Sequence, residues 1–149
     1  MYDIKYADDA FARKKIGNSI VDLDKKLLSQ LKNAGIIYAF DFLARSKTKE
    51  LRKVLSADTG IDYATILYLT KCCDLLRLLG VSKKTLHYLY ETGYDCVRNI
   101  KGENPVEVAG KVRLYMKSIG LKSGMPPCCS IEEVVKLAKI MPEVIEDFD

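Results

Sequence analysis

A glycine, a serine and two lysines lie together in the sequence where a turn between two helices is expected. The run GVSKK, residues 80–84, follows an apolar helical segment and begins another. Glycine lets a backbone approach a ligand closely, and the N–H groups and dipole at a helix start attract an anion. This run therefore predicts a phosphate-binding turn. The predicted phosphate-binding residues are Arg77, Gly80, Val81, Ser82, Lys83 and Lys84.

A second group of cations lies on and next to the helix expected after Thr48. The apolar residues of that helix share one face, so we expect the cations on the solvated face. This secondary basic face consists of Lys47, Lys49, Arg52 and Lys53. Convergence of this face with Arg77, Lys83 and Lys84 would favour nucleic-acid binding, whereas coverage of the Gly80 turn by the acidic tail or by other helices would count against it.

Residue types that perform catalysis or bind metals are sparse. His87 is the single histidine and has no recognisable catalytic partner, and no phosphate-loop, dinucleotide or H-E-x-x-H motif occurs. The five cysteines include two adjacent pairs but no C-x-x-C, and one backbone cannot easily aim adjacent thiols at one metal. We therefore expect no enzymatic activity, no cofactor and no metal, and cysteines buried as small hydrophobes.

Charge is distributed unevenly along the 149 residues. The chain carries a net charge of +4, whereas residues 132–149 hold six acidic and two basic side chains. The remainder is therefore moderately basic at +8, which is compatible with nucleic-acid binding. Lysine-rich helices are nevertheless most often simply solvated surface.

No apolar run approaches the roughly 20 residues that a membrane span needs. Acidic side chains occupy the N-terminal region where a signal peptide would be apolar. We expect a cytoplasmic protein without membrane contact, and nothing in the sequence predicts its oligomeric state.

Apolar residues recur at helical spacing along the chain, and no strand pattern is found. We expect Asp24, Thr48, Asp62 and Ser130 as helix N-caps, and a break over residues 120–129. The predicted fold is all-α, a compact single domain of eight to nine helices. The predicted helices run from Asp8 or Asp9 to Ile16, over 24–34, 38–44, 49–59, 63–79, 83–92, 95–101 and 105–120, and from Ser130 to Pro142.

The chain contains a weak internal repeat. Residues 21–26 align with residues 79–84, and the ungapped alignment continues through paired leucines to Gly35 and Gly93. Each copy then continues with a short helix and a longer one. The repeat predicts two halves, 18–79 and 80–141, with an N-terminal segment 1–17 that holds a short helix and an acidic tail 142–149.

Each copy resembles a helix-hairpin-helix unit, and the span from Asn18 to Met141 resembles the tandem helix-hairpin-helix family known as domain of unknown function 4332. The stretches that carry this resemblance are AGIIYAFDFLARSKTKELRKVLSADTGI, ILYLTKCCDLLRLLGVSKKTLHYLYETGY, ENPVEVAGKV and PPCCSIEEVVKLAKIMP. The resemblance implies a fold of two helix-hairpin-helix-like (SAM-like) halves. Through the broader helix-hairpin-helix group it also implies contact with nucleic-acid backbone phosphate, independent of base sequence.

The two copies fit phosphate binding unequally. Asp22 and Asp24 occupy both positions where such units have glycines, and Asp24 is simply an N-cap in the alternative interpretation. Ser82 replaces the second glycine of the other copy. Residues Tyr88, Tyr90 and Tyr94 could stack on bases or form the edge of the core.

Two functions therefore remain open. The chain binds nucleic acid through its second hairpin, or it is a protein-interaction or scaffold module on a helix-hairpin-helix fold that has lost nucleic-acid binding. In the second case its tyrosine-bearing surface or its acidic C-terminal surface would bind the partner.

Overall fold

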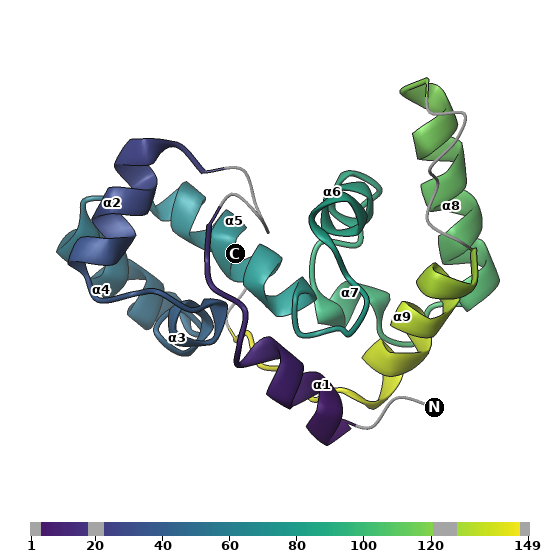
Figure 1. The fold of residues 1–149 in the computed structure, drawn as a ribbon, viewed down its shortest axis with the longest axis horizontal. Coiled ribbons are helices and arrows are strands. Elements are labelled where there is room, and N and C mark those ends of the chain that lie inside the picture. The colour runs from purple at the N-terminus through teal and green to yellow at the C-terminus, as the bar shows by residue number, and fades with distance from the viewer. Residues whose placement is uncertain (1–3, 18–22, 121–127, 147–149) are drawn as a thin grey trace.

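The computed structural model of the chain describes residues 4–17, 23–120 and 128–146. Within these ranges the fold is all-α, as predicted, with nine helices and no named strand (Figure 1). A single isolated antiparallel bridge joins Lys15 to Tyr38. The helices are α1 (Ile4–Phe11), α2 (Lys25–Asn33), α3 (Ala39–Ala44), α4 (Lys49–Thr59), α5 (Tyr63–Leu75), α6 (Lys83–Glu91), α7 (Val97–Ile100), α8 (Pro105–Ser118) and α9 (Cys128–Ile140).

Local capping residues set several of these boundaries. Asp24, Thr48 and Asp62 immediately precede α2, α4 and α5, and each side chain accepts a hydrogen bond from the backbone N–H three residues later. Such bonds satisfy donors that the helix itself leaves unpaired. These three predicted caps are confirmed, including the interpretation of Asp24 as an N-cap.

Helices α1, α5 and α9 differ from their predicted bounds. Helix α1 spans Ile4–Phe11 rather than running from Asp8 or Asp9 to Ile16, and Ala7 and Phe11 form its buried side. Helix α5 ends at Leu75 rather than at residue 79, and Arg77 lies in the turn that follows, where Nη1 donates to Asp74 Oδ1 at 2.7 Å. Helix α9 begins at Cys128, so Ser130 lies inside the helix and is not its N-cap, contrary to the prediction.

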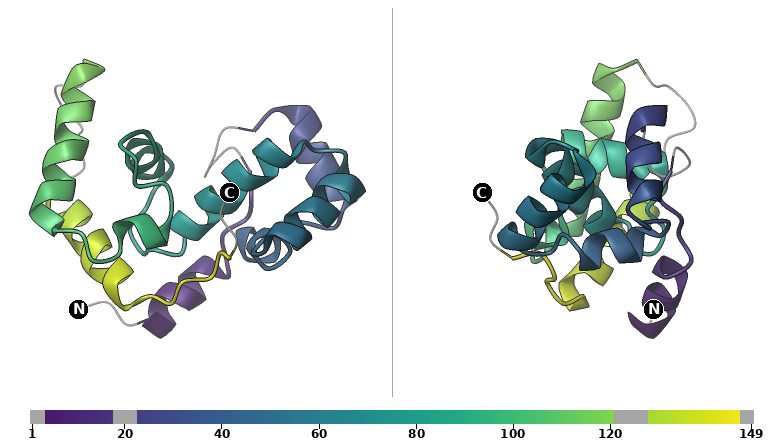
Figure 2. Two further views of the ribbon diagram at one scale, coloured as in Figure 1. Left: turned by 180° about the vertical axis from the view of Figure 1, so that it is seen from behind. Right: turned by 90° about the vertical axis from the view of Figure 1, so that its left-hand side faces the viewer.

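The helices form two groups with the same packing pattern. In the first group α2 packs on α4, and both α3 and α4 pack on α5. In the second group α6 packs on α8, and both α7 and α8 pack on α9. Contact between α5 and α6 joins the groups, and α8 projects at the end opposite α2 (Figures 1 and 2).

The correspondence between the groups extends to individual hydrogen bonds. Leu31 in α2 accepts a bond from the N–H of Ile36 at 2.9 Å, and Leu89 in α6, 58 positions later, accepts one from Tyr94 at 2.9 Å. Both leucines are fully buried. In each case the chain leaves the helix through a glycine with positive φ, a backbone conformation that favours glycine.

Residues 141–146, here called the C-terminal strap, follow α9 and run past α1 towards α3 (Figure 2). The carbonyls of Met141, Pro142 and Glu146 accept hydrogen bonds from Lys101, Arg77 and Arg52 at 2.9, 2.6 and 3.2 Å. Met141 and Ile145 are buried. The predicted acidic tail therefore begins with a packed segment, while residues 147–149 lie outside the described residues.

No helix in the described ranges is both long enough and apolar enough to cross a membrane.

Candidate nucleic-acid interface

The predicted phosphate-binding turn lies on the surface between α5 and α6. Gly80 is exposed with φ +91°, and a Cβ atom placed there would meet nothing within 4 Å. Val81 points inward and is 4% exposed, while the Ser82 hydroxyl accepts a bond from the N–H of Thr85 at 3.3 Å. Lys84 is exposed on the first turn of α6. The backbone at Gly80 is thus open to a ligand.

The same turn occurs a second time, between α4 and α5. Gly60 has φ +75°, Ile61 is 4% exposed, and Asp62 caps α5 as Ser82 caps α6. Both turns share a sequence pattern: a glycine, a β-branched residue, and a capping residue three positions before a threonine. The sequence analysis did not recognise this second occurrence of the pattern. The same turn geometry occurs where the capping residue is Asp62, whose carboxylate would repel phosphate. The primary role of this geometry is therefore to connect two helices. Charge at the capping position distinguishes the two turns.

Arg77 does not belong to the exposed turn, so its prediction as a phosphate ligand is not supported. Its side chain is buried, and Nη1 donates to Asp74 Oδ1 at 2.7 Å. The other oxygen of Asp74 accepts from the N–H of Val97 at 2.8 Å, at the start of α7. Burial raises the pKa of Asp74, against the opposing effect of these hydrogen bonds. Through Asp74, Arg77 therefore connects the end of α5 to the start of α7 in the interior.

The secondary basic face is also smaller than predicted. Arg52 is fully buried, because its guanidinium donates to the carbonyls of Ser46 and Glu146 and to the hydroxyl of Tyr63. The expectation that Arg52 lies in solvent is wrong. The exposed members are Lys47, Lys49 and Lys53. They lie on or beside α4 in the first helix group, so they do not converge with the turn before α6 (Figure 1).

Helix α6 meets α8 through a histidine and a tyrosine. His87 Nε2 lies 3.4 Å from the hydroxyl of Tyr115, and the ring centroids are 6.2 Å apart. Lys83 and Lys84 precede His87 by four and three residues, which places them on its side of α6, and Lys111 precedes Tyr115 by four in α8. These five residues, here called the basic strip, were not recognised as a unit in the sequence because they come from two helices.

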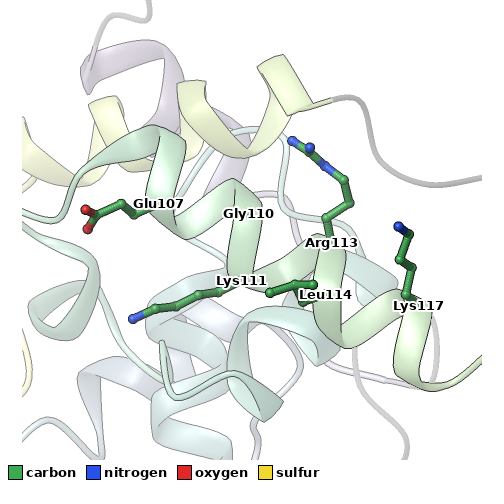
Figure 3. Close-up of a pocket in the computed structure, with 6 residues that line it drawn as sticks. All are labelled: Glu107, Gly110, Lys111, Arg113, Leu114 and Lys117. Carbon is green, nitrogen blue, oxygen red and sulfur yellow. The ribbon is translucent and has the colours of Figure 1, made fainter.

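A groove of about 490 Å³ continues from the basic strip along α8. Its lining includes Lys111, Arg113 and Lys117, with Gly110 and Leu114 between the cations and Glu107 towards the helix start. Figure 3 shows Lys111 extending to one side of α8 and the other two cations to the opposite side. Sequence reasoning missed this group, although Arg113 and Lys117 stand at i, i+4.

The tyrosines considered for base stacking belong mainly to the core. Tyr88 and Tyr94 are buried, and half-buried Tyr90 packs edge-to-face on Tyr68 at 5.0 Å. The core-edge interpretation is therefore confirmed.

Three cysteines are buried thiols, as predicted. Cys72, Cys73 and Cys96 are free, and burial raises the pKa of Cys72 to about 12. The side chains of Cys128 and Cys129, and also Asp22, lie outside the described residues.

A sequence profile of the family described as domain of unknown function (DUF4332) matches residues 22–141. The chain belongs to this family. The DUF4332 match spans both helix groups and includes the Gly80 turn, the basic strip and the α8 groove. Helix α1 and strap residues 142–146 lie outside it. Searches of curated proteins and of solved structures gave no match.

Proposed function

We propose that this DUF4332 domain is a non-enzymatic binding domain that contacts nucleic-acid backbone phosphates through the Gly80 turn and the basic strip. The supporting observation is the contact between His87 and Tyr115. It joins the lysine-bearing start of α6 to the lysine-bearing face of α8, so that cations from two helices can follow one phosphate backbone. In this proposal the domain is a helix-hairpin-helix protein with one active hairpin.

The chemistry of the turn fits an anion. The open backbone at Gly80 permits close approach, the positive end of the α6 dipole attracts negative charge, and Lys83 and Lys84 add two cations. Contacts of this kind recognise phosphate rather than base sequence. His87 and Tyr115 also offer ring surfaces on which unpaired bases could stack.

The test compares two double variants that change the net charge equally. The Lys83→Glu/Lys84→Glu variant alters the proposed site, and Lys25→Glu/Lys26→Glu alters the equivalent first turn of α2, 58 positions earlier. Glutamate is favourable in the first turn of a helix, so both variants should fold. Affinities for single-stranded and duplex DNA and RNA are measured at several salt concentrations.

We expect weak binding that falls steeply with salt, because phosphate contacts release counterions. The variant at the start of α6 should bind at least tenfold more weakly, with a shallower salt dependence, while the variant at the start of α2 should lose much less. Absence of binding at low salt would reject the proposal, as would equal losses in the two variants.

A single substitution separates the turn geometry from its charge. Ser82→Asp should retain the N-cap of α6, because Asp62 caps α5 in the same turn. The added carboxylate should nevertheless repel phosphate and weaken binding. A variant with native stability and unchanged affinity would show that nucleic acid does not contact the turn.

The alternative function, a protein-interaction or scaffold module, is favoured by a different observation. Val106 and Leu114 on α8 are each 68% exposed, and phosphate contact makes no use of such apolar surface. After nuclease treatment, specific capture of a defined partner by the native chain but not by Leu114→Asp would support this function.

A further inference from the structure

A second cavity lies away from the basic strip, where α1, α3 and the C-terminal strap meet. Its volume is about 420 Å³, within the range of small-molecule sites. The strap residues Pro142 and Val144 form one wall, and α1 contributes Asp8 and Phe11. All four residues lie outside the family match, so this cavity combines the family domain with segments beyond it. The other described residues that line it are Phe40, Leu43, Ala44, Lys47 and Arg77.

The walls of the cavity are mainly apolar. Phe11 and Leu43 are each 4% exposed, whereas Phe40 is 54% exposed. The rings of Phe11 and Phe40 pack edge-to-face with centroids 6.3 Å apart. This leaves an aromatic surface accessible at the cavity, of the kind that stabilises an apolar ligand by removing it from water.

The polar groups of the cavity favour a negative charge. Arg77 lines it although the side chain is almost completely buried, and a guanidinium has five N–H donors. Nη1 donates to Asp74 and Nη2 to Pro142, so part of its charge is already compensated. Lys47 is exposed, and no carboxylate among the described residues forms an ion pair with it. Among the described residues that line the cavity, Asp8 is the one acidic side chain.

We propose that this cavity binds a small apolar carboxylate, an aliphatic or aromatic acid of about the size of octanoate. The carboxylate accepts hydrogen bonds from Lys47 and Arg77, and the hydrocarbon packs against Phe11, Phe40 and Val144. Charge-assisted bonds of this type orient a ligand, while the apolar walls supply most of the affinity. The site is independent of the nucleic-acid interface.

The test uses octanoate as the probe and octylammonium as its matched control, with the same chain length and opposite charge. Each is titrated below its micellar concentration into the full ¹⁵N-labelled chain, and amide chemical shifts are followed. We expect saturable shifts for octanoate at residues of α1, α3 and the strap. Octylammonium should bind at least tenfold more weakly.

Two variants with surface controls locate the site. Phe40→Asp and Lys47→Glu should each weaken octanoate binding at least fivefold, whereas Leu114→Asp and Lys53→Glu, both at exposed positions elsewhere, should leave it unchanged. A well-dispersed spectrum of each variant establishes that it is folded. Equal binding of the two probes would overturn the proposal, as would shifts confined to α8 or unchanged affinity in the cavity variants.

Discussion

The side chains of Asp74 and Arg77 form a buried ion pair, with exposed fractions of 3% and 5%. Each partner also bonds to a distant backbone group, Asp74 to the N–H of Val97 and Arg77 to the carbonyl of Pro142. One pair therefore connects the end of α5, the start of α7 and the C-terminal strap.

We expect Arg77→Leu to lower the free energy of unfolding by about 3–5 kcal/mol, because Asp74 would remain as a buried charge without its partner. Urea denaturation monitored by circular dichroism measures the change. The double variant Asp74→Leu/Arg77→Leu is the control, since it removes both charges together. It should be less destabilised than the sum of the two single variants, and strict additivity would contradict the ion-pair argument.

The hydrogen-bond partners of the buried arginines could not be predicted from the sequence. Arg52 and Arg77 lie next to lysines or leucines in helical stretches, and composition gives each the appearance of a solvated cation. Their acceptors include Glu146 and Pro142, which lie 94 and 65 positions away. No local pattern encodes partners at that separation, so two of the ten predicted site residues were misplaced for the same reason.

At the scale of elements, helix ends that depend on neighbouring residues were predictable. The N-caps at Asp24, Thr48 and Asp62 act within three residues, so the sequence alone located α2, α4 and α5 closely. The end of α5, both boundaries of α1 and the start of α9 were not located from the sequence. The sequence also located the exposed Gly80 turn but not the basic strip, whose side chains become a group only when α6 and α8 pack together.

Gly80 and Gly110 differ in backbone conformation, so replacement by alanine should have opposite effects on stability at the two positions. Gly80→Ala should destabilise the chain by about 1–2 kcal/mol, because its φ of +91° is unfavourable for any residue with a Cβ atom. Gly110→Ala should stabilise it by about 0.5–1 kcal/mol, since Gly110 lies inside α8 with a normal φ and open space at the Cβ position. Thermal and urea denaturation measure both. Destabilisation by Gly110→Ala would show that the face of α8 is more crowded than its geometry indicates.

At the scale of the whole molecule, the repeat was the most informative feature of the sequence. The alignment of residues 58 positions apart predicted two equivalent helix groups, and the groups share packing pattern and helix-ending turns. The repeat could not predict the strap, because the segment has no counterpart in the first copy. The strap contacts both helix groups and should therefore contribute to stability, which its acidic composition did not indicate.

Deletion of residues 142–149 tests that role. The truncated chain loses the buried side chain of Ile145 and the strap carbonyls that accept from Arg52 and Arg77. Burial of one such side chain contributes about 1.5–3 kcal/mol, and each hydrogen bond to a charged group contributes a similar amount. We therefore expect the free energy of unfolding to fall by roughly 4–9 kcal/mol in urea denaturation. Glu143→Gln is the control, because its ion pair with Arg98 is exposed at 3.4 Å and should contribute less than about 0.5 kcal/mol. A truncated chain as stable as this control would mean that the two helix groups hold together without the strap.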